Sequence, residues 1–159
     1  MRFKKINISS YIKNNEKSPL SNFYINSARR TLALLSSDYP GVGKWFDTKV
    51  MPGLSNYTRD ILLITYRDEI AALSIFKNDS FEKKICTIRV APKYQHVGLG
   101  SIIVETGMEY LDTRYPLITV PESKVCQFDN LFNKFNFRIN DIKNNVYTPG
   151  NRECYINLA

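Results

Sequence analysis

Residues 95–100, with the sequence QHVGLG, combine two glycines and a polar start at a point where the sequence changes from strand-like to helix-like. A helix that begins here leaves its first backbone N–H groups unpaired, and its dipole adds partial positive charge. Glycines allow close approach of the backbone and a positive φ, and Ser101 adds a hydroxyl in the first turn. We therefore expect this turn to bind an anion such as a phosphate through its backbone amides.

Two common phosphate loops do not fit this spacing. A Walker loop needs the pattern GxxxxGK[ST], and no lysine follows the glycines here. A Rossmann fingerprint needs GxGxxG, whereas this segment has the reverse order of spacings. The pattern that remains is Q-x-x-G-x-G after a segment that ends V-A-P.

The elements that must position this turn follow from hydrophobic periodicity. The predicted strands cover 2–8, 60–66, 70–77, 83–90 and 115–120, with a final hairpin of 137–147 and 152–158, and the predicted helices cover about 18–36, 42–50, 99–113 and 125–135. The Pro-Gly pair in MPGL (51–54) is expected to end the second helical segment, and Asn136 to end the last one in a left-handed conformation. This order predicts an α/β fold with a mixed sheet, and a right-handed crossover between the strands at 83–90 and 115–120.

Composition limits the remaining possibilities. A chain of 159 residues with 43% hydrophobic residues is enough for one core, so we expect a single domain over residues 1–159. No segment reaches the ~18 apolar residues of a membrane helix, and the N-terminal segment lacks the apolar run of a secretory signal. We therefore expect an intracellular, cytoplasmic protein without a membrane partner.

Charge and cysteines point to no special site. The net charge of +7 is dispersed along the sequence, which favours a generally basic surface and leaves a nucleic acid or a phosphorylated ligand as the alternative. Cys86, Cys126 and Cys154 are far apart and have no histidine at metal-ligand spacing. We interpret them as buried thiols and expect no disulfide framework and no metal site.

With its flanking strand and helix, the Q-x-x-G-x-G turn resembles the pyrophosphate loop of the GNAT superfamily of acyl-CoA-dependent N-acetyltransferases. The segment LFNKFNF at 131–137 is similar to a late motif of that family, L-[YF]-x-K-x-G-F, and the predicted order of elements matches the family along nearly the whole chain. The resemblance implies a mostly antiparallel sheet, flanked by helices, that is splayed between its fourth and fifth strands. It also implies acetyl-CoA as the cosubstrate.

The resemblance assigns coenzyme-binding positions one by one. Val90 matches the position whose backbone pairs with the pantetheine arm, and Phe132, together with Lys134, would lie along the other side of the coenzyme. We interpret His96 as a solvated residue near the phosphates, and not as a general base. The pyrophosphate loop is matched by Gln95, His96, Val97, Gly98, Leu99, Gly100 and Ser101.

The acid and base of the reaction are less conventional. Phe132 stands where many members carry a tyrosine acid, and Lys84 where some carry a glutamate base. Glu122, at the end of the strand at 115–120, is our candidate for accepting the amine proton, with a helix-dipole role as the alternative. Tyr147 is our candidate for protonating the leaving thiolate, with an ordinary aromatic role as the alternative. Transfer without a side-chain acid is also compatible with a thiolate leaving group.

Two further acid or nucleophile candidates are weaker. Cys126 would have to be an acylated nucleophile, and a buried thiol is the simpler interpretation. Glu82, at the edge of the strand at 83–90, is a second possible carboxylate. The acceptor pocket is the least readable part, because Trp45, Phe46, Tyr57 and Tyr147 could line it or belong to the core.

The predicted function is transfer of an acetyl group from acetyl-CoA to a primary amine by direct attack in a ternary complex. A small amine or an amino acid-like molecule is the expected acceptor, and a protein amine or a tRNA stays open, the latter for a toxin-like acetyltransferase acting on aminoacyl-tRNA. The rival classes are an acyl-CoA-binding sensor without turnover and a nucleic-acid-binding protein with a structural glycine turn. The sequence leaves the oligomeric state open, a dimer included.

Overall fold

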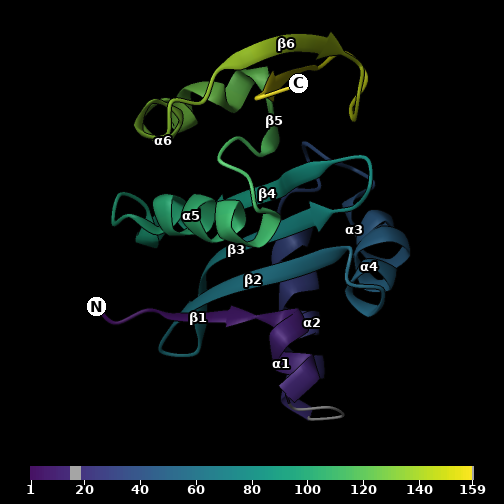
Figure 1. Ribbon diagram of the computed structural model, residues 1–159, viewed down its shortest axis with the longest axis vertical. Coiled ribbons are helices and arrows are strands. Elements are labelled where there is room, and N and C mark those ends of the chain that lie inside the picture. Colours follow the sequence, from purple (N-terminus) through teal and green to yellow (C-terminus); the bar gives the residue numbers. More distant parts are fainter. Residues whose placement is uncertain (15–18, 159) are drawn as a thin grey trace.

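The computed structural model describes residues 1–14 and 19–158, and their elements form a mixed sheet flanked by helices (Figure 1). The strands are β1 (Lys4–Asn7), β2 (Arg59–Tyr66), β3 (Glu69–Asn78), β4 (Lys83–Val90), β5 (Leu117–Pro121), β6 (Ile139–Asn144) and β7 (Arg152–Ile156). The helices are α1 (Ile8–Asn14), α2 (Pro19–Ala33), α3 (Val42–Trp45), α4 (Met51–Ser55), α5 (Leu99–Leu111) and α6 (Asp129–Lys134). Shorter turns are the π-helix η1 (Phe46–Val50) and the 3-10 helices η2 (Pro92–Tyr94) and η3 (Glu122–Phe128).

The sheet has the strand order β1-β2-β3-β4-β5-β7-β6. All neighbouring strands are antiparallel except β4 and β5, which are parallel and pair only at Lys84 with Leu117 and at Ile85 with Ile118. Beyond these residues the two strands separate, and Figure 1 shows β5, β6 and α6 as a block set apart from β1–β4. The predicted α/β fold, with a mostly antiparallel sheet splayed between its fourth and fifth strands, is confirmed.

Strand alternation sends apolar side chains to both faces of the sheet. In β2, Leu62 and Ile64 join a cluster that includes Leu99, Ile103 and Val104 of α5, whereas Ile61 and Leu63 face the cluster beneath α1–α4. Figure 1 shows α5 in front of the central strands and α2 behind them. Helix α5 can lie close to the sheet because Gly107 has no Cβ. A Cβ there would come within 2.8 Å of Ile85 Cδ1. The sheet is thus covered on both faces, and the turn before α5 lies at one end of it.

The first strand is shorter than predicted. Strand β1 ends at Asn7, and helix α1 begins at Ile8. The reason is the buried carboxylate of Asp60, which accepts the Ser9 N–H at 2.9 Å and so satisfies a donor of the first turn of α1. The predicted start of the next helix at Ser18 lies outside the described residues, and α2 begins at Pro19.

The prediction that Pro52 and Gly53 end the second helical segment is wrong. The wide turn η1 comes first, in which the Met51 N–H donates to the Phe46 carbonyl, and α4 then continues to Ser55. Pro52 is the second residue of α4 and directly follows the wide turn η1, the kind of irregular turn at which a helix can contain a residue without a backbone N–H. The last predicted helix is also divided, into η3 and α6, and Asn136 has the expected positive φ of 57°.

Two other expectations need correction. Strand β6 ends at Asn144, so Tyr147 lies in the loop that joins β6 to β7 and not at a strand end. Of the three cysteines only Cys154 is buried, because Cys86 is partly exposed and Cys126 lies exposed on η3, which buries none of its residues.

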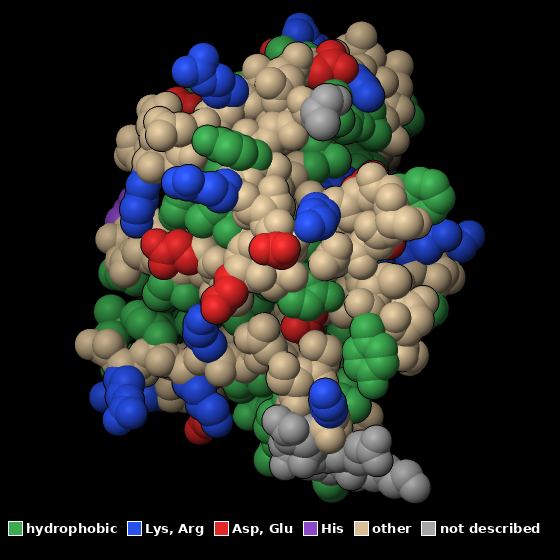
Figure 2. All heavy atoms as spheres, viewed as in Figure 1, with side chains coloured by type: hydrophobic (Ala, Val, Ile, Leu, Met, Phe, Trp, Pro, Cys, Tyr) green, Lys and Arg blue, Asp and Glu red, His purple; other side chains and the backbone are tan. Residues whose placement is uncertain are grey.

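The surface carries charged side chains of both signs (Figure 2). On the face drawn in Figure 2, Lys and Arg side chains are scattered among acidic and neutral ones and form no continuous stripe. Within the described part of the chain, no helix is long and apolar enough to cross a membrane. The same residues hold no group of three or more His, Cys, Asp or Glu side chains arranged for a metal ion.

Candidate functional site

The turn between β4 and α5 exposes the N-terminus of α5. Gly98 is the residue before the helix and has φ 92°, a left-handed conformation that glycine adopts without strain. No side chain caps this end, and a Cβ at Gly98 would have no heavy atom within 4 Å. The Ile102 N–H bonds to the Gly98 carbonyl at 3.2 Å, so the N–H groups of Leu99, Gly100 and Ser101 precede the first helical hydrogen bond.

The side chains around this turn leave it open. His96 and Val97 are exposed, and His96 has φ 63°. Gln95 is also exposed and donates through Nε2 to the Val90 carbonyl at 3.3 Å. Val90, whose backbone was expected to meet the pantetheine arm, is partly exposed and pairs with Ala72 of β3.

Helix α6 adds a cation beside the turn. Lys134 donates through Nζ to Ser101 Oγ at 3.0 Å and lies 4.0 Å from a Glu105 carboxylate oxygen. Phe132, in contrast, is only 5% exposed, and its ring stacks on Phe128 with 5.5 Å between centroids. Of the two α6 residues that were predicted to lie along the coenzyme, Lys134 therefore presents its ammonium at the turn, while the Phe132 ring belongs mainly to the core.

On the opposite face of the sheet from α5, a pocket of about 440 Å³ opens where β4 and β5 separate. A β-bulge shapes its floor, because Thr87 pairs with Ile75 and Ile85 with Phe76, which leaves Cys86 as the extra residue. The lining residues are Leu35, Tyr39, Gly41, Val42, Trp45, Arg59, Lys77, Glu82, Lys84, Cys86, Thr87, Thr119, Val146 and Tyr147.

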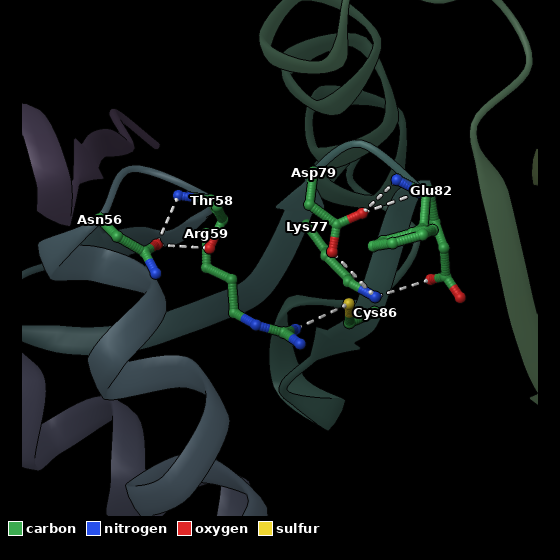
Figure 3. Close-up of polar contacts among 8 residues, drawn as sticks. Asn56, Thr58, Arg59, Lys77, Asp79, Glu82 and Cys86 are labelled. Carbon is green, nitrogen blue, oxygen red and sulfur yellow. Dashed lines mark hydrogen bonds and ion pairs between the residues drawn. The ribbon is translucent and has the colours of Figure 1, made fainter.

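One wall of the pocket is polar and comes from the ends of β2, β3 and β4 (Figure 3). The Arg59 guanidinium donates to Cys86 Sγ at 3.6 Å. Lys77 Nζ lies 3.2 Å from an Asp79 oxygen and 3.4 Å from a Glu82 oxygen. Asp79 also accepts the N–H of Glu82 at 2.9 Å, so this carboxylate holds the β3–β4 turn in shape.

Tyr147 reaches the pocket from the β6–β7 loop. Its hydroxyl accepts a hydrogen bond from Lys84 Nζ at 3.1 Å, and its ring packs edge-on against Tyr39 with 5.2 Å between centroids. Burial lowers the pKa of Lys84, but Tyr147, Cys86 and Glu82 together raise it, and the net pKa lies above its ordinary value. Lys84 is therefore a cation at neutral pH, and Tyr147 keeps its own O–H free to donate.

A buried carboxylate lies behind Tyr39. Glu153 of β7 is 4% exposed and accepts the Tyr39 hydroxyl at 2.9 Å, with Thr119 as a second hydrogen-bond partner. Burial raises the pKa of Glu153 above its ordinary value, which the hydrogen bonds from Tyr39 and Thr119 offset only in part. Sequence reasoning missed Glu153, and no local signal marks it, because the segment RECYI does not alternate between polar and apolar residues.

The remaining sequence-predicted residues are divided between the pocket and other parts of the structure. Glu122 forms an ion pair with Arg152 Nε at 3.1 Å and does not line the pocket, so the structure brings Tyr147 and Glu122 to different surroundings. Cys126 does not line it either. Of the four candidate acceptor-pocket aromatics, Trp45 and Tyr147 line it, Phe46 is a core residue with 1% exposure, and Tyr57 is 71% exposed elsewhere.

Comparisons with known proteins complete the description. No protein-family model matches this sequence, and no curated protein matches it. The structure is similar to a GNAT-family protein from Desulfovibrio desulfuricans, with TM-score 0.69 and 14% identity over 98% of this chain and 97% of the other.

Two further solved structures are similar as well. A GNAT-family acetyltransferase from Bacillus cereus has TM-score 0.66 and 13% identity, over 98% of this chain and 96% of the other. One from Elizabethkingia anophelis with acetyl-CoA bound has TM-score 0.52 and 21% identity, over 69% of this chain and 82% of the other. With its splayed sheet and open glycine turn, this chain has the fold of the GNAT-family acetyltransferases.

Proposed function

We propose that this protein transfers the acetyl group of acetyl-CoA to a primary amine by direct attack in a ternary complex. The observation that carries the proposal is the separation of β4 from β5, with the open turn before α5 at one end and the 440 Å³ pocket on the opposite face. A thioester held along the end of β4 would thus face an amine held in the pocket. The likeness to structures of GNAT-family proteins, one with acetyl-CoA bound, supports the choice of donor.

The coenzyme phosphates suit the open N-terminus of α5. The N–H groups of Leu99, Gly100 and Ser101 and the positive end of the helix dipole favour an anion there, and Lys134 adds a full positive charge next to Ser101. Gln95, His96, Val97 and Gly98 would form the rest of this loop mainly through their backbone. The pantetheine arm would displace the Gln95 amide from the Val90 carbonyl, a hydrogen bond of 3.3 Å at an exposed position.

The chemistry forms a C–N bond and breaks the C–S bond of the thioester. The amine nitrogen attacks the carbonyl carbon, the negative charge that develops on the carbonyl oxygen meets the Val90 N–H, and coenzyme A leaves as a thiolate. Tyr147 is the proposed acid for this sulfur. Its oxygen already accepts a hydrogen bond from the Lys84 ammonium, which makes its O–H a stronger donor toward the thiolate.

The amine must lose a proton before or during attack. Glu122 remains the sequence-predicted acceptor, but its ion pair with Arg152 places it outside the pocket lining. The geometry favours Glu153, because Tyr39 lines the pocket and donates to this carboxylate at 2.9 Å. Tyr39 would take the amine proton on its oxygen while its own proton moves to the ionised Glu153, so the proton ends on a buried carboxylate that becomes neutral, and whose raised pKa favours holding it.

Calorimetric titration with acetyl-CoA tests the donor site. We expect binding by the wild-type protein and a loss of affinity of at least about tenfold in Gly98→Glu, because a carboxylate would repel the phosphates. Gly150→Glu is the matched control, since Gly150 also has a positive φ of 82° and open space around its Cα. Equal binding by all three proteins, or no binding by the wild type, would contradict the proposal.

Turnover separates an enzyme from a binding module. Release of coenzyme A should accompany acetylation of an added amine, measured by chromatography because the exposed Cys126 would itself react with a thiol reagent. Acetyl-CoA binding without release with any amine, protein N-terminus or aminoacyl-tRNA would instead identify a sensor without turnover.

A further inference from the structure

Three cations form a row along the polar wall of the pocket. Arg59 of β2 lies directly opposite Lys77 of β3, and Lys77 lies opposite Lys84 of β4. Residues paired in this way point to the same face of a sheet, and all three line the pocket. Because neighbouring strands are ~4.8 Å apart, this cationic row spans about 10 Å.

Like charges directly opposite each other destabilise a sheet unless nearby carboxylates compensate them, so we consider the ion-pair partners of each cation. Lys77 is compensated by Asp79 and Glu82. Arg59 and Lys84 have no ion pair with a carboxylate among the residues that the structure describes. The two ends of the cationic row therefore carry positive charge that no direct ion pair within the described residues neutralises, and Lys84 feels Glu82 and the buried Glu153 only from a longer distance.

The partners that these two cations do have are uncharged. Arg59 donates to the Cys86 thiol, a weak acceptor, and lies 5.6 Å from the centroid of the Trp45 ring. Burial raises the pKa of Cys86, so this sulfur stays a neutral thiol. Lys84 donates to the Tyr147 hydroxyl. A ligand could displace either contact at small cost and supply the missing negative charge.

We propose that the acceptor amine also carries an anionic group, a carboxylate in the first instance, which binds between Arg59 and Lys84. This inference rests on the proposed acetyl transfer. The planar guanidinium fork of Arg59 matches a carboxylate, and the pocket volume of about 440 Å³ suits a small molecule. Leu35, Val42 and Trp45 line the pocket too and would receive an apolar body. The acceptor class is therefore that of amino acids and related amino acid-like molecules.

The same charges disfavour simple amines. A diamine or polyamine would bring a second cation next to Arg59 and Lys84, and Glu82, a carboxylate that lines the pocket, is already paired with Lys77. For an amine with a carboxylate, the cations also help the reaction, because a positive field lowers the pKa of the attacking ammonium and increases its neutral fraction. Binding therefore sets the preference for an anionic acceptor, whereas the lowered ammonium pKa helps every amine in the pocket.

Matched acceptor pairs test the inference. Acetylation is measured for L-phenylalanine against 2-phenylethylamine, L-leucine against 3-methylbutylamine, and O-phosphoethanolamine against ethanolamine, where the last pair separates a phosphate from a carboxylate preference. We expect kcat/KM to be about tenfold or more higher for a carboxylate-bearing member, the size of one charge-assisted hydrogen bond. Arg59→Gln should remove most of this ratio, because glutamine keeps part of the stem but not the charge.

The ratio within a pair distinguishes anion binding from a general effect. A loss of fold or of Tyr147 positioning would lower both members equally, whereas loss of the anion contact lowers only the anionic member. Lys84→Gln should lower both members through Tyr147 and reduce the ratio as well. Lys83→Gln is the control, since Lys83 is exposed, donates to the Asp112 carbonyl and does not line the pocket.

A binding measurement keeps the test independent of turnover. Calorimetry with N-acetyl-L-phenylalanine and N-acetyl-2-phenylethylamine should show the same preference in the wild type and its loss in Arg59→Gln. Acetyl-CoA binding without any preference for an anionic member would overturn this inference and leave the proposed function standing. An Arg59-dependent preference without acetyl-CoA binding would support the anion site and contradict the proposed function.

Discussion

The environment of Glu153 raises its pKa and so affects both the stability of the fold and the proposed proton transfer. Its carboxyl is buried on β7 between Tyr39 and Thr119, and burial raises its pKa above the ordinary 4.5. The folded protein therefore holds this proton more tightly than the unfolded chain. The resulting stabilisation is complete below the ordinary carboxyl pKa and is lost as the pH rises through the raised pKa of the folded state.

Glu153→Gln should separate the two roles. We expect its free energy of unfolding near pH 8 to equal or exceed that of the wild type by up to about 1 kcal/mol, because no charge is buried. Acetyl transfer should fall about tenfold or more and lose the rise with pH that reports a deprotonated base. Denaturant unfolding and pH–rate profiles measure these effects.

Glu122→Gln is the matched control for that experiment. Glu122 is partly exposed and ion-paired with Arg152, so its loss should change stability by less than about 1 kcal/mol. If Glu122→Gln abolishes transfer and Glu153→Gln does not, the sequence-predicted base is the correct one.

At the scale of elements, α5 and α6 together determine the charge at the glycine turn. Helix α5 presents its N-terminus, and Lys134 at the end of α6 reaches Ser101 in the first turn of α5 at 3.0 Å. An anion at the turn would therefore meet a helix dipole and a mobile ammonium from two different elements. The dipole is a property of the backbone, whereas the ammonium can be removed by substitution.

Lys134→Gln should weaken acetyl-CoA binding about three- to tenfold and make binding less sensitive to salt, because one screened charge contact is lost. Lys143→Gln is a suitable control, since Lys143 on β6 is similarly exposed and also lies near a carboxylate, that of Asp141. Calorimetry at two salt concentrations provides the measurement. Equal affinities for both variants would show that Lys134 makes no contact with the phosphates.

At the scale of the whole molecule, the sheet is continuous, but its neighbouring strands pair over very different lengths. Strands β2 and β3 pair along their full length, whereas β4 and β5 pair at only two positions. The block of β5, β7 and β6 also ends in β6, whose residues are all exposed. The splay that makes room for the pocket thus leaves one part of the sheet with fewer hydrogen bonds to the rest.

Hydrogen exchange should reveal this difference. We expect backbone amides of β5 and β6 to exchange faster than those of β2 and β3, because they can open without disrupting the central strands. Acetyl-CoA should slow exchange near Val90 and Thr119 more than in β1. Uniform protection of all seven described strands would contradict a weaker attachment of β5 and β6 to the central strands. Protection that acetyl-CoA leaves unchanged would contradict the proposed placement of the coenzyme.

Local patterns were sufficient for much of the fold. Runs of β-branched and large apolar residues identified β2, β3 and β4, helical spacing identified α5, and the glycine spacing identified the turn between β4 and α5. These features depend on residues a few positions apart, which is why sequence alone could predict them. The errors at Ile8 and Pro52 arose where a distant carboxylate or a wide helical turn outweighed local preference.

The pocket depended on contacts that no local pattern contains. Tyr39 and Glu153 are 114 residues apart, and Arg59, Lys77 and Lys84 become neighbours only through the register of three strands. Register and the β4–β5 separation are set by the packing of the whole core, and a shift of one residue would turn the cationic row away from the pocket. The open glycine turn before α5 could therefore be predicted from sequence, whereas the pocket emerged only when the sheet was assembled.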